Sequence, residues 1–75
     1  MSLHPVKRRD FIRKLKRLGF DDVQSGAKHA FMRYGTYRQR LPNDDEYSVP
    51  LLKRLLKQVE QGIGRPLSDD EWNSL

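Results

Sequence analysis

The chain has 75 residues, enough for one small domain, and no cysteine, which excludes disulfides, thiolate metal sites and a cysteine nucleophile. Residues 1–40 have eleven basic and three acidic side chains, a net charge of +8, whereas residues 41–75 have four and seven, a net charge of −3. A strongly basic half favours a polyanionic partner, usually nucleic acid, although a solvated basic surface would give the same composition.

The first predicted element is an amphipathic helix over residues 5–18. Apolar residues recur at helical spacing from Phe11 to Leu18, and Gly19 follows as a stop signal. Lys and Arg fill most positions between the apolar ones, so the outer face of this helix is basic. The candidate RNA contacts on that face are Arg13, Lys16 and Arg17.

Three short strands are predicted next, over residues 20–25, 28–34 and 37–41. Gly26 marks the first turn, and Gly35-Thr36 is a tight hairpin connection between the last two strands. The alternation in 28–34 separates Ala30, Met32 and Tyr34 from His29, Phe31 and Arg33. That in 37–41 separates Tyr37, Gln39 and Leu41 from Arg38 and Arg40.

A polar loop over 43–48 leads to a second helix, which Ser48 can cap and which Gly62 and Gly64 close. Its apolar stripe contains Leu51, Leu52, Leu55, Leu56 and Val59. Ser68 can cap a short last helix within a C-terminal extension over 66–75, with Trp72 as its apolar anchor.

This order predicts a single α+β domain over residues 1–75, in which an antiparallel three-stranded meander packs against helices on one face. Residues 1–4 are expected to be disordered or left over from an expression vector. The residues expected to fill the layer between helices and sheet are Phe11, Leu15, Leu18, Met32, Leu41, Leu51, Leu55 and Val59. With no apolar run near the roughly 20 residues of a membrane span and no signal peptide, a cytoplasmic location is expected.

Catalysis without a metal is the chemistry that the residue types favour. There is no helical HExxH pair and no phosphate-binding glycine loop, and the two histidines are far apart in sequence. RNA supplies its own nucleophile, the 2′-hydroxyl, and a histidine such as His29 can take that proton near neutral pH. A lone histidine at the entrance of a strand is, however, more often an exposed or hydrogen-bonded polar residue than a catalytic one. The cations that could stabilise the phosphorane are Lys28, Arg33, Arg38 and Arg40.

The aromatic residues among these cations also have two interpretations. Phe31, Tyr34 and Tyr37 could stack on unpaired bases, or the two tyrosines could form a cross-strand pair beside the hairpin. The functional alternatives are a non-catalytic module that binds duplex RNA by shape and, less favoured, a DNA-binding regulator.

The segments "RRDFIRKLKRLGF", "SGAKHAFM", "RLPN" and "LLKRLLKQ", in this order and spacing, resemble the HicA toxins of HicA–HicB toxin–antitoxin systems. The resemblance spans residues 7–75. It implies a fold like a double-stranded-RNA-binding domain and a metal-independent ribonuclease acting on messenger RNA, with no cofactor.

The resemblance also implies roles for residues and partners. The family's catalytic histidine matches His29, in a glycine-x-x-histidine pattern that begins at Gly26, where a tight turn would bring backbone amides close to the phosphate. A HicB-like antitoxin is expected to cover this face, and operator DNA is expected to be reached only through the antitoxin complex. The resemblance does not assign a second acid/base group.

Overall fold

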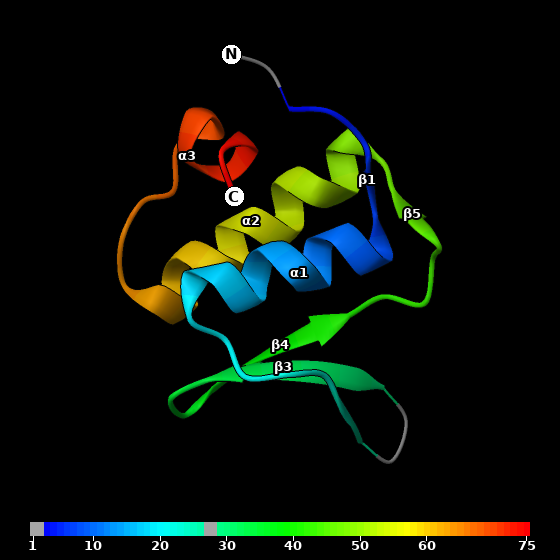
Figure 1. Ribbon diagram of the computed structural model, residues 1–75, viewed down its shortest axis with the longest axis vertical. Helices are drawn as coiled ribbons and strands as arrows, with labels where there is room; N and C mark the ends of the chain where they lie inside the picture. The colour runs from blue at the N-terminus through cyan, green and yellow to red at the C-terminus, as the bar shows by residue number, and fades with distance from the viewer. Residues whose placement is uncertain (1–2, 27–28) are drawn as a thin grey trace.

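The structure, a computed structural model, describes residues 3–26 and 29–75. Its elements are β1 (Val6–Lys7), α1 (Arg8–Leu18), β2 (Gln24–Ser25), β3 (Ala30–Tyr34), β4 (Tyr37–Leu41), β5 (Glu46–Tyr47), α2 (Val49–Ile63) and α3 (Asp69–Asn73). Strands β2, β3 and β4 form an antiparallel sheet in that order, with α1 and α2 on the same side of it (Figure 1). The predicted α+β class with a three-stranded antiparallel sheet is therefore confirmed. Within residues 3–26 and 29–75, no helix is long and apolar enough to cross a membrane.

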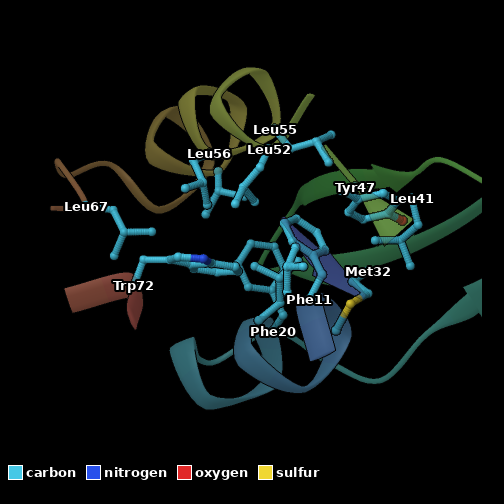
Figure 2. Close-up of a cluster of buried hydrophobic side chains, with 13 residues drawn as sticks. Phe11, Phe20, Met32, Leu41, Tyr47, Leu52, Leu55, Leu56, Leu67 and Trp72 are labelled. Carbon is cyan, nitrogen blue, oxygen red and sulfur yellow. The ribbon is translucent and has the colours of Figure 1, made fainter. Parts of the chain in front are cut away.

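The core lies between α1, α2 and the inner face of the sheet, and Trp72 of α3 closes one end of it (Figure 2). Six of the eight expected core residues are buried, whereas Leu18 and Leu51 are partly buried and pack against the cluster. The buried residues outside the expected eight are Val6, Phe20, Gln39, Tyr47, Leu52, Leu56, Leu67 and Trp72.

A second, two-stranded sheet was not predicted. Val6 and Lys7 pair antiparallel with Tyr47 and Glu46, so α1 begins at Arg8 and the predicted start at residue 5 was wrong. Tyr47 is fully buried and its hydroxyl donates to the carbonyl of Pro42 at 2.8 Å. The loop predicted over 43–48 therefore contains a strand, which is too short to give an alternation signal in the sequence.

Of residues 1–4, which were expected to be disordered or left over from an expression vector, the structure describes residues 3 and 4. Leu3 packs against the core and His4 is exposed. Residues 1 and 2 lie outside the described part of the chain.

Strand β2 is shorter than the predicted range of 20–25. The Asp22 carboxylate accepts a hydrogen bond from the backbone N–H of Val23 at 2.8 Å, so this N–H group does not pair with β3. Before this point, the N–H of Asp21 still donates to the carbonyl of Arg33 at 2.8 Å. The segment thus follows β3 along most of its length, which keeps the turn after β2 at the end of the sheet.

Helix α2 continues through Gly62 to Ile63, so the interpretation of Gly62 as a stop was wrong. The ring of Tyr37, the first residue of β4, packs against the helix at Gly62, and a Cβ at this position would clash with it. The helix therefore needs a glycine here.

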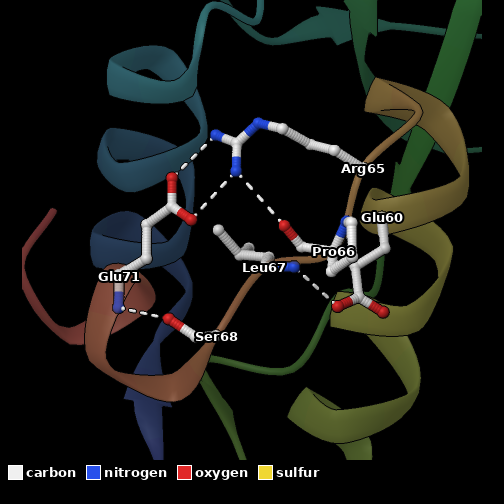
Figure 3. Close-up of polar contacts among 6 residues, drawn as sticks. All are labelled: Glu60, Arg65, Pro66, Leu67, Ser68 and Glu71. Atoms are coloured by element: carbon white, nitrogen blue, oxygen red, sulfur yellow. Dashed lines mark hydrogen bonds and ion pairs between the residues drawn. The ribbon is translucent and has the colours of Figure 1, made fainter.

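The C-terminal extension forms a helix as expected, and Ser68 caps α3 by accepting from the N–H of Glu71 at 3.1 Å. The Glu71 carboxylate does not complete a capping box and instead pairs with both terminal nitrogens of Arg65, at 2.9 and 2.7 Å (Figure 3). The Glu60 carboxylate accepts from the N–H of Leu67 at 2.7 Å, which ties the connecting segment back to α2.

Candidate nucleic-acid interface

The uncovered face of the sheet collects three arginines, Arg33, Arg38 and Arg40, here called the sheet arginines. The register pairs Arg33 with Arg38 and Phe31 with Arg40, and paired residues point to the same face. Met32 and Gln39, also a pair, are fully buried on the inner face, so the sheet arginines point away from the helices. The predicted alternation of both strands is confirmed at these positions.

The sheet arginines lack acidic partners in residues 3–26 and 29–75. The ion pairs of this part join Arg13 to Asp10, Lys16 to Asp22, and Arg65 to Glu71. The Arg38 guanidinium instead lies over the ring of Phe31, 5.1 Å from its centroid. The outer sheet face therefore has three uncompensated positive charges and one aromatic ring.

His29 lies at the end of this sheet, in the connection between β2 and β3, and is exposed. Its carbonyl accepts a hydrogen bond from the N–H of Gly26 at 2.9 Å, which closes the turn. A Cβ on Gly26 would lie 2.9 Å from that carbonyl oxygen and 3.5 Å from the ring of Phe31, so the turn needs a glycine because of space. Lys28, the remaining predicted contact in this turn, lies outside the described residues.

The His29 imidazole has no hydrogen bond or ion pair with any side chain of the described residues. A catalytic histidine is often oriented by a carboxylate, and no such group holds this one. Its side chain is thus accessible to a ligand and lacks an orienting partner in this part of the chain.

The basic residues of α1 form a second surface, because α1 packs on the opposite face of the sheet (Figure 1). The three predicted contacts on it, Arg13, Lys16 and Arg17, are here called the helix cations. Together with Arg9 and Ile12 they line an open hollow of about 500 Å³. Arg13 lies 3.8 Å from Asp10 and the Lys16 ammonium 3.6 Å from Asp22, so two of the three have acidic neighbours. The predicted RNA contacts therefore do not converge on one site.

Tyr34 and Tyr37 are a cross-strand pair, and both rings pack against Phe20, with centroids 5.2 and 6.4 Å away. The Tyr37 hydroxyl donates to the side-chain carbonyl of Gln39, and burial raises the pKa of this tyrosine. Of the three aromatic candidates, Phe31 alone points to the outer sheet face.

The contact between Phe31 and Arg38 is the feature of this face that the sequence reasoning missed. The two residues are diagonal neighbours across β3 and β4, so the signal was available once the hairpin register was fixed by Gly35-Thr36. In the described part of the chain, no group of three or more His, Asp or Glu side chains is placed to hold a metal ion.

Comparison of the chain with protein-family models, with curated proteins and with solved structures gave no match.

Proposed function

We propose that the protein is a metal-independent endoribonuclease of the HicA toxin type, acting on messenger RNA in the cytoplasm. The observation that supports this most directly is the exposed His29 at the end of a sheet whose outer face has three arginines without acidic partners among the described residues. The order of helix, three antiparallel strands and helix agrees with the double-stranded-RNA-binding-domain-like fold of that family.

In the proposed reaction, the His29 imidazole takes the proton of a ribose 2′-hydroxyl, and the oxygen attacks the adjacent phosphorus. Guanidinium groups of the sheet arginines stabilise the charge on the phosphorane oxygens. The bond to the 5′ oxygen then breaks and that oxygen takes a proton from solvent, leaving a 2′,3′-cyclic phosphate and a 5′-hydroxyl. No metal or cofactor enters these steps.

The partner in this proposal is a HicB-like antitoxin, acidic or neutral, that covers the face with His29. A basic nuclease in its own cytoplasm needs such an inhibitor, and the sheet arginines offer it three positive charges that no acidic side chain of residues 3–26 and 29–75 pairs. Co-expression with the neighbouring reading frame is expected to restore growth and to give a stable complex. Operator DNA would be bound through this complex.

A non-catalytic RNA-binding module is the second candidate, and the lack of an orienting partner for His29 among the described residues favours it. Incubation of the purified protein with RNA in EDTA separates the two functions. Cleavage supports the nuclease, whereas retention of RNA without cleavage supports the module.

A further inference from the structure

The outer sheet face places two positive charges opposite each other, which is unfavourable when no ligand is bound. Arg33 and Arg38 stand directly opposite each other on β3 and β4, and like charges in this position destabilise a sheet. Neither has an acidic partner within residues 3–26 and 29–75, and Arg40 adds a third charge on the same face. A bound polyanion would relieve this repulsion, so charge complementarity points to such a ligand.

The same face has one aromatic ring, and it lies under a guanidinium group. The Arg38 guanidinium lies over the ring of Phe31, 5.1 Å from its centroid, and the two side chains are here called the stack. Unpaired bases stack on aromatic rings and on arginine planes, whereas the bases of an A-form duplex are already stacked inside it. The stack therefore favours a single strand over a duplex.

The stack is also joined to the turn with His29. Ring atoms of Phe31 lie 3.5 and 3.6 Å from the position of a Cβ on Gly26, and the N–H of Gly26 holds the His29 carbonyl at 2.9 Å. A nucleotide on the stack is thereby brought to the end of the sheet where His29 lies.

We infer that Phe31 and Arg38 form a stacking site for one unpaired base of single-stranded RNA, with Arg33 and Arg40 binding the flanking phosphates. The inference deepens the proposed function, on which it rests for the chemistry: the substrate is a single strand, and the cut falls beside the stacked nucleotide. Duplex RNA lacks an available base and is bound weakly at this face.

The test measures binding without cleavage, in a His29→Ala background. Three labelled probes are compared by fluorescence anisotropy: a short single-stranded RNA, the same strand annealed to its complement, and the same strand with abasic nucleotides. Phe31→Leu keeps an apolar side chain beside Gly26 but removes the ring, and Arg38→Gln removes the charge from an exposed position. Lys57→Gln, an exposed position on α2, is the control for charge.

We expect Phe31→Leu and Arg38→Gln each to weaken binding of the single strand by about five- to 100-fold, as the loss of base stacking does elsewhere. Lys57→Gln is expected to leave the affinity for the single strand within about twofold of the parent's, since a cation far from the outer sheet face makes no phosphate contact there. The duplex and the abasic strand should bind the unsubstituted face at least fivefold more weakly than the single strand.

Equal binding of duplex and single strand, an unchanged affinity in both Phe31→Leu and Arg38→Gln, or no RNA binding at all would overturn the inference. Its failure is distinguishable from failure of the proposed function. If the stacking tests succeed but the parent protein cuts no RNA, the nuclease assignment fails and the binding site stands. If the parent cuts duplex and single strands equally, the nuclease stands and the stacking site fails.

Discussion

The indole of Trp72 lies against the ring of Phe11, with centroids 5.4 Å apart, so the last helix is part of the same core as the first. Phe11 also meets Tyr47 edge-on at 5.2 Å. The Lys14 ammonium donates to the Trp72 carbonyl at 2.9 Å and lies over the indole, 5.0 Å from its centroid. The C-terminal extension is thus held to α1 by both apolar and polar contacts.

Trp72→Ala is expected to lower the free energy of unfolding by about 3–5 kcal/mol, the usual cost of removing a buried aromatic side chain. A domain of this size has a total stability of only about 5–10 kcal/mol, so the variant should be close to unfolding at 37 °C. Urea unfolding followed by circular dichroism measures the change. Glu71→Gln, in the same helix but on an exposed ion pair, is the control and should keep the parent's midpoint. A parent-like midpoint for Trp72→Ala would mean that α3 is not part of the cooperative core.

Stability should fall with rising pH above about pH 10. Burial raises the pKa of Tyr37 and of Tyr47, so the unfolded chain loses these protons before the folded one does. The stabilisation is complete below the unfolded pKa and is lost as pH rises through the folded values. Burial lowers the pKa of Lys14, which gives a slope of opposite sign, so Tyr37→Phe and Tyr47→Phe are needed to isolate the tyrosines. Each variant is expected to show a smaller fall in the free energy of unfolding between about pH 10 and 11.5, measured by urea titrations. If both variants keep the parent's fall, the tyrosines are not its cause.

How far the sequence predicts this fold depends on the length of each pattern. The leucine stripe of α2 and the alternation in β3 and β4 extend over many residues, and both predicted the correct faces. The β1–β5 pair has two residues in each strand, which is too short for a period, and the burial of Tyr47 depends on this long-range pairing.

The candidate site was predicted as residue types and not as a geometry. The sequence placed His29 and the sheet arginines on one side of the strands. The register agrees for the sheet arginines, whereas His29 lies before β3, which begins at Ala30 and not at the predicted residue 28. The expected core residues Leu15 and Met32 already placed α1 on the face opposite the sheet arginines, so the helix cations lie away from that face. The sequence could not show that the His29 carbonyl approaches Gly26, because this contact depends on the fold of the turn and not on a positive φ angle.

Gly26→Ala should slow RNA cleavage while the domain stays folded. The added Cβ would lie 2.9 Å from the His29 carbonyl oxygen, so the turn must move. A displacement of about 1 Å in a catalytic group can cost on the order of 100-fold in rate.

Gly35→Ala is the matched control for this variant. A Cβ at Gly35 meets nothing within 4 Å, but its φ of +60° makes the substitution cost about 1 kcal/mol of stability. It should therefore lower the melting temperature and leave the cleavage rate per folded molecule unchanged. Parent-like cleavage by Gly26→Ala would show that the turn does not position His29.

RNA binding should depend on salt mainly through the sheet arginines. On single strands each phosphate contact contributes about −0.7 to the slope of log K against log salt. Replacing all three by Gln should make the slope shallower by about 1.4, because Arg33 and Arg40 are the two that bind phosphates. Replacing the helix cations by Gln removes the same charge but should change the slope less, since two of them have acidic neighbours. A larger change from the helix cations would place the RNA on α1.

The rate of RNA cleavage in EDTA by His29→Ala tests the central claim most directly. Removing a general base typically lowers the rate by a factor of about 10²–10⁴. His4→Ala is the matched control, since it removes the second histidine of the chain, which is also exposed but lies near the chain start. Both variants should unfold at nearly the parent's temperature, because exposed substitutions usually change stability by no more than about 0.5 kcal/mol. The account predicts that His29→Ala loses cleavage while His4→Ala keeps it; a folded His29→Ala that cuts RNA at the parent's rate would contradict the assignment of His29.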